Sequence, residues 1–160
     1  MNGTLRTARL LLVPADVDEL RAKYDGPAGA PAAVSPKWLE KLRRAQAPDP
    51  WEFGYTVVHA ESRRTIGGVS FKGAPGSDGL VEIAYGIEEA FQRQGYATEA
   101  AAALVDFAFA DPRVRIVCAH TARDAVASPR VLEKCGFTHV GEVADPEDGL
   151  VWRFERRRPA

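Results

Sequence analysis

Residues 92–97 place a glycine, an arginine and several polar side chains where a strand gives way to a helix. An apolar run over 80–87 predicts the strand, and an alanine-rich run over 97–109 predicts the helix. Gly95 lies between them, where the first N–H groups of a helix have no intrahelical partner and the helix dipole is positive. Such a turn can bind a phosphate or pyrophosphate. Arg93 can add a charged donor, and Gly95 removes the Cβ that would hold a ligand away.

Two common phosphate motifs are absent from this turn. No Gly-Lys-Ser/Thr follows Gly95, which excludes a P-loop, and no Gly-x-Gly-x-x-Gly precedes the helix, which disfavours a Rossmann dinucleotide site. A cofactor that carries a pyrophosphate and needs no metal fits the pattern, and coenzyme A is the leading candidate. An ordinary strand-to-helix turn is the competing interpretation.

The strand predicted over 80–87 presents one acid and two very small residues on a single face. Side chains alternate along a strand, so Glu82, Ala84 and Gly86 share that face. Small side chains leave room for a ligand against the sheet, and a glycine inside a strand indicates a bulge or a close backbone approach. Close packing of a helix against Ala84 and Gly86 explains the pattern equally well.

Four runs of the sequence form a recognisable set: EIAYGI (82–87), FQRQGYATEA (91–100), SPRVLEKCGF (128–137) and, near the start, ARLLLVP (8–14). They resemble the acetyl-CoA-binding core, the second signature and the first strand of GNAT-type N-acetyltransferases. The nearest branch is the one that contains the ribosomal-protein N-terminal acetyltransferases. The resemblance covers nearly the whole chain.

The resemblance implies an α/β fold, with one GNAT-like domain over residues 1–160 and a mixed, mostly antiparallel central sheet flanked by helices. It also implies transfer of an acetyl group from acetyl-CoA to a primary amine by direct attack in a ternary complex. The acceptor, either a peptide amine such as a protein N-terminus or a small-molecule amine, carries no recognisable code. A non-catalytic acyl-CoA-binding or regulatory domain is the alternative, and a nucleotide-phosphate module is a more distant one.

The resemblance also implies where acetyl-CoA lies. Its pyrophosphate is expected on the turn and the first helical turn, and its pantetheine arm beside the preceding strand. A backbone N–H near the end of that strand is expected to stabilise the tetrahedral oxyanion. The expected cofactor-binding residues are Ile87, Gln92, Arg93, Gln94, Gly95, Tyr96, Ala97, Thr98, Asp124 and Ser128.

Amine acylation needs a proton acceptor, because a primary amine has a reference pKa of about 10.4 in lysine and arrives mostly protonated at neutral pH. Glu82 is the expected catalytic base, directly or through a water, since the family often uses a glutamate on the matching strand. Ser128 is the second expected catalytic residue, although capping of its own helix also explains it. The family's thiolate-protonating tyrosine is matched by Leu132, and an asparagine that usually precedes the second signature is matched by Ala125.

The elements that must position these residues follow from hydrophobic periodicity and turn residues. Asp16 is expected to cap the first helix, with Glu19 completing a capping box. A loop is predicted over 26–36. Trp38 and Trp51 are expected to pack the second helix or to form an aromatic wall for the acceptor. Strands are predicted over 10–14, 53–59, 65–72, 80–87, 114–121, 138–142 and 150–156, and helices over 17–24, 36–46, 97–109 and 129–135.

Composition sets the remaining limits. A length of 160 residues with 46% hydrophobic side chains predicts one domain with a full core, and a net charge of −1 gives no reason to expect nucleic acid. No run is long and apolar enough to span a bilayer, so no membrane partner is expected. The three histidines and two cysteines lack the spacing of metal ligands, so no metal is expected. Two distant cysteines favour a reduced, cytoplasmic setting, and a homodimer is possible because dimers are common for this fold.

Overall fold

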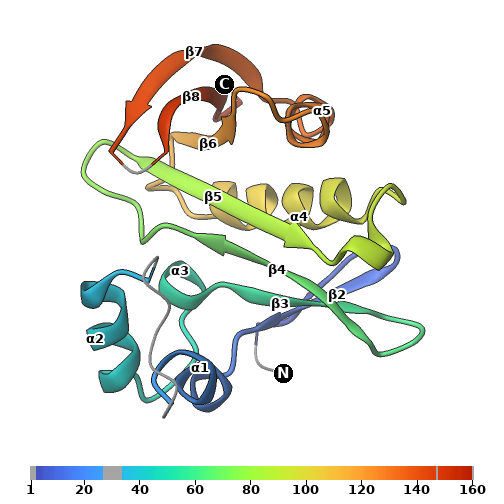
Figure 1. The fold of residues 1–160 in the computed structure, drawn as a ribbon, viewed down its shortest axis with the longest axis vertical. Coiled ribbons are helices and arrows are strands. Elements are labelled where there is room, and N and C mark those ends of the chain that lie inside the picture. Colours follow the sequence, from blue (N-terminus) through green and yellow to red (C-terminus); the bar gives the residue numbers. More distant parts are fainter. Residues whose placement is uncertain (1–2, 27–33, 147, 160) are drawn as a thin grey trace.

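Eight strands form one continuous sheet at the centre of the protein, in the order β1-β2-β3-β4-β5-β6-β8-β7 (Figure 1). The structure is a computed structural model that describes residues 3–26, 34–146 and 148–159. Neighbouring strands are antiparallel except for β5 and β6, which run parallel. The predicted mixed, mostly antiparallel sheet is therefore confirmed. The strands are β1 (Leu5–Arg6), β2 (Leu10–Pro14), β3 (Tyr55–His59), β4 (Thr65–Phe71), β5 (Leu80–Ile87), β6 (Ile116–Ala122), β7 (Thr138–Asp145) and β8 (Gly149–Arg157).

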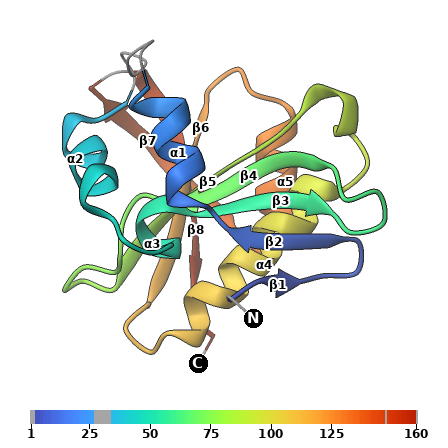
Figure 2. The same ribbon diagram turned by 90° about the horizontal axis from the view of Figure 1, so that it is seen from below.

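The helices separate into two groups (Figures 1 and 2). The long helix α4 lies against the sheet with α5 beside it, whereas α1 and α2 pack on each other away from α4, near β3 and β4. In the part of the chain that the structure describes, no helix combines the length and apolar character needed to traverse a bilayer. The bounds are α1 (Val17–Tyr24), α2 (Pro36–Arg44), α3 (Pro50–Phe53), α4 (Tyr96–Ala110) and α5 (Ala127–Lys134), with a 3₁₀ helix η1 (Glu89–Phe91).

The core lies between α4 and the sheet. Apolar residues recur along α4 at intervals of three and four, which places them on one side of the helix. Small alanine side chains let this side approach the strands closely. From α4 the fully buried residues are Ala100, Ala101, Leu104, Val105 and Ala108, and they belong to one cluster with Leu10, Leu12, Val81 and Ile83 of the strands.

Several predicted elements match the structure residue for residue. The strands over 10–14 and 80–87 and the helix over 17–24 are observed with those bounds. Asp16 caps α1, since its carboxylate accepts the N–H groups of Asp18 at 2.8 Å and Glu19 at 3.0 Å. The capping box is incomplete, because among the described residues no side-chain bond of Glu19 returns to Asp16.

The strand predicted over 53–59 is wrong at its start, because Pro50–Phe53 forms the short helix α3. Asp49 accepts the N–H of Trp51 at 3.0 Å, and Gly54 ends the helix with a φ of 70°. β1 and η1 were not predicted, since two or three residues are too few to show a hydrophobic period. Of the predicted loop over 26–36, residues 27–33 lie outside the described part of the chain.

The remaining elements are confirmed with shifted ends. α2 ends at Arg44, two residues before the predicted end, and β6 begins at Ile116 rather than at residue 114. β7 and β8 extend beyond their predicted ranges toward the turn that joins them. α5 begins at Ala127 rather than at residue 129, a shift that changes the interpretation of Ser128.

Candidate active site

β5 and β6 pair only along their first residues. The paired positions run from Leu80 with Ile116 to Glu82 with Cys118, and no later pair joins these two described strands. On its other edge β5 stays paired with β4 as far as Ile87. The sheet therefore opens between β5 and β6 beyond Glu82.

The backbone of β5 turns two N–H groups toward this opening. The hydrogen bond from Lys72 N to Glu82 O, 2.9 Å long, shows that Glu82 bonds to the β4 side. Bonded and non-bonded positions alternate along an antiparallel pair, so Tyr85 and Ile87 direct their N–H groups away from β4. Neither residue has a β6 partner in the described chain. Ile87 N–H is thus available to a ligand, as the predicted oxyanion contact requires.

The turn before α4 presents a row of backbone N–H groups without intramolecular partners. Arg93 and Gly95 both adopt left-handed conformations, with φ of 64° and 83°. Gly95 is the N-cap residue of α4, and no side chain caps the helix. Within the described residues, none of the N–H groups from 93 to 98 donates a hydrogen bond. This is the geometry of an anion site at a helix N-terminus, while anion binding itself stays a prediction.

The side chains of the turn take different roles from its backbone. Gln92 donates its side-chain amide to Ile87 O at 2.9 Å, which fixes the end of β5. Tyr96 is 8% exposed and packs in the core, so only its N–H can reach a ligand. Arg93 is exposed and can move toward a bound phosphate. Ala97 and Thr98 complete the first turn of α4, half-buried.

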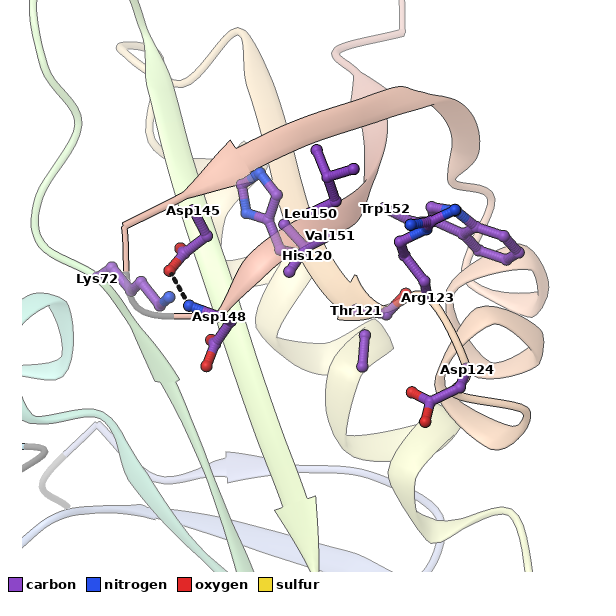
Figure 3. Close-up of a pocket in the computed structure, with 11 residues that line it drawn as sticks. Lys72, His120, Thr121, Arg123, Asp124, Asp145, Asp148, Leu150, Val151 and Trp152 are labelled. Atoms are coloured by element: carbon purple, nitrogen blue, oxygen red, sulfur yellow. Dashed lines mark hydrogen bonds between the residues drawn. The ribbon is translucent and has the colours of Figure 1, made fainter.

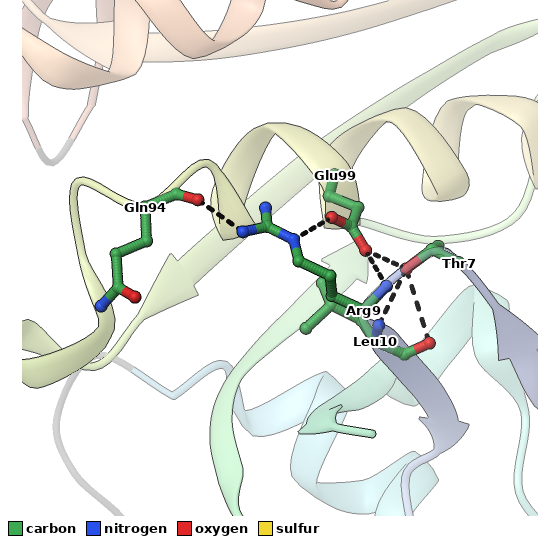
Figure 4. A network of polar contacts seen from close by, with 5 residues as sticks. All are labelled: Thr7, Arg9, Leu10, Gln94 and Glu99. Carbon is green, nitrogen blue, oxygen red and sulfur yellow. Dashed lines mark hydrogen bonds and ion pairs between the residues drawn. The ribbon is translucent and has the colours of Figure 1, made fainter. Parts of the chain in front are cut away.

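Arg9, which the sequence analysis missed, links the start of β2 to the start of α4 (Figure 4). Its Nε donates to Glu99 Oε1 and its second guanidinium nitrogen to Gln94 O, each at 2.8 Å. The guanidinium also lies 4.3 Å from the centre of the Tyr96 ring. A contact between residues 90 positions apart leaves no local signal in the sequence.

Glu99 accepts two further hydrogen bonds that anchor the same corner. Its Oε2 accepts the hydroxyl of Thr7 and, at 2.8 Å, the N–H of Arg9. Burial opposes ionisation of Glu99, but the hydrogen bonds from Thr7 and Arg9 outweigh it and lower the pKa of the carboxyl. The ionised Glu99 therefore holds the first turn of α4 against the N-terminal segment.

Glu82 lies where β5 and β6 part and forms a compact polar cluster. Its Oε2 lies 2.9 Å from Nδ1 of His120 and 3.0 Å from Nζ of Lys72. The side chains of Glu82 and His120 are 22% and 21% exposed. The sequence pattern indicated Glu82, but it gave no sign that Lys72, which follows β4, and His120 lie beside that carboxylate.

Cys118 completes a group that resembles a metal site, since single atoms of Glu82, Cys118 and His120 lie within 4.8 Å of one another. Two features favour a hydrogen-bonded cluster instead. The ammonium of Lys72 already neutralises the carboxylate. Burial raises the pKa of the Cys118 thiol to about 11, so the thiol is protonated in the metal-free protein.

Two cavities border the opening. The first, about 610 Å³, is lined by the end of β6 and the β7–β8 hairpin, and Figure 3 shows His120 and Asp145 in its wall. Thr121, 7% exposed, also lines it, and its hydroxyl has no hydrogen-bond partner among the described residues. The second, about 950 Å³, lies between α1, α2, β3 and β4. Lys72 lines both cavities, and its Nζ lies 3.0 Å from Glu82 Oε2.

Trp38 and Trp51 lie in different surroundings. Trp38 lines the larger cavity and donates its indole N–H to Glu52 O at 2.8 Å. Trp51 instead packs on Phe71 and Phe107, with ring centres 4.4 and 5.2 Å away. Trp38 also packs α2 on Tyr24 and Phe53, with ring centres 5.4 and 5.9 Å away, as predicted for the second helix. An aromatic wall for the acceptor stays a prediction.

The segment after β6 corrects one interpretation of Ser128. Since α5 begins at Ala127 and has no side-chain cap, Ser128 lies inside the first turn and does not cap the helix. Its carbonyl accepts the hydroxyl of Tyr85 at 3.2 Å, which connects β5 to α5 across the opening. Asp124 is exposed beyond the end of β6, and Leu132 is fully buried in the core.

A central sheet whose two parallel strands separate, with a glycine-led helix at the opening, is the architecture of GNAT-type acyltransferases. The family model of the Acetyltransferase (GNAT) domain matches residues 9–138, and this chain belongs to that family. The resemblance seen in the sequence and the GNAT-like fold that it implied are both confirmed.

Individual relatives extend the comparison. The uncharacterized N-acetyltransferase YjdG of Bacillus subtilis (strain 168) is 31% identical over 99 residues, which cover 62% of this chain and 56% of that protein. The match thus spans little more than half the length of that relative. A putative GNAT-family acetyltransferase from Bordetella pertussis is similar in structure, with 26% identity, a TM-score of 0.67 and coverage of 96% of this chain and 98% of the other.

RimL, a ribosomal L7/L12 alpha-N-protein acetyltransferase solved in complex with coenzyme A, shares the fold. Its TM-score is 0.67 at 20% identity, over 96% of this chain and 97% of the other. At that identity the likeness shows the fold alone.

Proposed function

We propose that this protein transfers an acetyl group from acetyl-CoA to a primary amine by direct attack in a ternary complex. The observation that carries the proposal is the row of unpaired backbone N–H groups from 93 to 98, beside the opening of the sheet. Their number and direction suit a pyrophosphate, with Arg93 as an added cation. The coenzyme A complex of RimL, on the same fold, supports this choice of cofactor.

The pantetheine arm would follow β5 from this turn toward Glu82. Ala84 and Gly86 leave that face of the strand open, and a Cβ built on Gly86 meets no atom within 4 Å. The N–H groups of Tyr85 and Ile87 face the opening, where carbonyl oxygens of the pantetheine arm can accept hydrogen bonds from them. Asp124, in the loop after β6, and Ser128, in α5, are the proposed contacts at the far side of the opening.

The reaction joins the amine nitrogen to the thioester carbonyl carbon and breaks the bond from that carbon to sulfur. Ile87 N–H is the proposed donor to the oxyanion. The amine proton passes to the cluster that contains Glu82. Leu132 stands where the family has its tyrosine, so the thiolate leaves unassisted or takes a proton from water. The Ser128 hydroxyl is the proposed side-chain donor.

Release of the coenzyme A thiol, measured with acetyl-CoA and a panel of amines, tests the proposal. The panel should include peptides with free N-termini, lysine derivatives, polyamines and single amino acids. Turnover with at least one amine is expected. Binding of coenzyme A without turnover across the panel would favour a non-catalytic acyl-CoA-binding or regulatory domain, for which the buried Leu132 is the supporting observation.

Calorimetry with coenzyme A and with ATP tests the cofactor separately. Coenzyme A should bind and ATP should bind more weakly, because only the former has an arm that fits beside β5. Preference for ATP would overturn the assignment of the turn. A cytoplasmic location and a homodimer stay predictions, which fractionation and sedimentation can examine.

A further inference from the structure

His120 uses one ring nitrogen to bind Glu82 and leaves the other available to the smaller cavity. Nδ1 lies 2.9 Å from Glu82 Oε2, and His120 is part of the cavity wall (Figure 3). An ionised carboxylate can only accept, so Nδ1 carries the proton of the neutral ring. Nε2 then presents a lone pair, and in the described residues no donor or acceptor is bound to it.

The side chains of Glu82 and His120 are almost equally exposed, but only His120 lines one of the two described cavities. Its Oε2 already has two donors, Nζ of Lys72 at 3.0 Å and Nδ1 of His120 at 2.9 Å. Glu82 lines neither of the two cavities, whereas His120 and Lys72 line the first. An amine that enters the cavity therefore reaches the imidazole before it reaches the carboxylate.

We propose that Nε2 of His120 is the atom that accepts the proton of the acceptor amine, and that Glu82 is a positioning residue that fixes the tautomer of His120. The inference rests on the proposed acetyl transfer and identifies the proton acceptor of that same site. A buried acid that orients an imidazole and stabilises its cation is a recurrent arrangement in acyl transfer.

In the transfer one bond forms, one bond breaks and one proton moves. The amine nitrogen forms a bond to the thioester carbonyl carbon, and the electron pair of the carbonyl moves onto oxygen. When the intermediate collapses, the carbon–sulfur bond breaks and the thiolate leaves. The proton lost by nitrogen goes to Nε2, and the imidazolium returns it to the thiolate or to solvent. The products are an amide and the thiol of coenzyme A.

Charged and titratable groups surround the ring from each strand packed against it. Arg153 lies opposite His120 on β8 and donates Nε to Glu155 at 2.8 Å. Acidic groups stabilise the imidazolium once it has formed, and the cations help it to release its proton. The groups facing this region are Glu82, Lys72, Cys118, Arg153, Glu155 and Asp145. Arg123, Asp124 and Asp148 line the same cavity.

The pH dependence of kcat/KM in the variants His120→Gln and Glu82→Gln separates the two roles. A protonated ring cannot take the amine proton, so kcat/KM of the wild type should fall toward acid pH. His120→Gln should lower kcat/KM at pH 7 by about 100-fold or more and abolish this acid limb. Glu82→Gln keeps an oxygen for Nδ1–H, so a loss of about 10-fold is expected, with the limb moved to lower pH because the amide carries no charge.

The opposite pattern would overturn the inference: loss of the limb in Glu82→Gln and its retention in His120→Gln would make Glu82 itself the acceptor. His59→Gln is the matched control, because His59 bonds Ser62 at 2.8 Å and lines neither cavity. Added imidazole should partly restore turnover to His120→Ala and should leave His59→Gln unchanged.

Nitrogen NMR of the His120 ring gives a readout that needs no turnover. The neutral ring of the free protein should carry its proton on Nδ1, and a proton on Nε2 would contradict the inference. Absence of acetyl transfer by the wild type with every amine would refute the proposed function, whatever the tautomer. Normal wild-type turnover with unaltered pH dependence in His120→Gln would refute only the role of His120.

Discussion

Replacing Gly86 by valine tests whether the open face of β5 is the path of the cofactor. A Cβ at this position meets no atom within 4 Å, and the backbone conformation of Gly86 lies outside the left-handed region. The added Cβ therefore causes no clash in the free protein. A glycine inside a strand costs about 0.5–1 kcal/mol relative to alanine, so Gly86→Val should be as stable as the wild type or more stable.

The same isopropyl group would project into the space assigned to the pantetheine arm. Forcing extra methyl groups into an occupied, well-packed space costs about 1–3 kcal/mol. That cost corresponds to a loss of about 5- to 150-fold in affinity for coenzyme A. Calorimetric titration with coenzyme A, together with thermal unfolding of the free protein, measures both quantities.

Thr138→Val is the control, because it presents the same isopropyl side chain, in place of a threonine of similar size, at an exposed position on the edge strand β7. It should change neither the affinity for coenzyme A nor the melting temperature by more than a small amount. Unchanged affinity in a folded Gly86→Val protein would refute the path along this face of β5. A lower melting temperature would show that the space over Gly86 is filled by the protein itself.

Three further perturbations test other parts of the structure. Gly95→Ala should lower stability by about 1–2 kcal/mol because Gly95 has a φ of 83°, and should weaken coenzyme A binding, both measured by unfolding with and without the cofactor. Glu99→Gln should cost about 2 kcal/mol at pH 7. Because the folded-state pKa of Glu99 is lowered, this difference in urea unfolding should persist above about pH 4.5 and vanish as pH falls through the folded pKa. Cys118 and Cys135 are buried free thiols with raised pKa values, so mass spectrometry should find them unmodified by iodoacetamide until the protein unfolds.

The sequence was informative wherever the chemistry is local. The alternation in β5, the glycine-led start of α4 and the cap at Asp16 each depend on residues within one or two turns, and each is observed. The capping role considered for Ser128 failed because the helix begins two residues earlier than predicted, at Ala127, a boundary that tertiary contacts decide. The helix α3 was missed because four residues show no period.

The sequence indicated only part of the candidate site, because the contacts that complete it are not local. Glu82 and the turn at Gly95 stand in recognisable runs, but their partners come from distant strands. His120 is 38 positions from Glu82 and Arg9 is 90 positions from Glu99, so only the register of the sheet brings them together. A lone histidine or arginine in a sequence carries no sign of such a contact.

The short parallel seam between β5 and β6 has a mechanical consequence. Three backbone pairs are the described strand pairing between a leaf made of β1–β5 and a leaf made of β6–β8. A ligand bound between the two leaves should restrain them, and its release should let the leaves move relative to each other about the seam. Amide hydrogens on both margins of the gap should therefore exchange more slowly in the loaded protein, even at residues that the guest never touches.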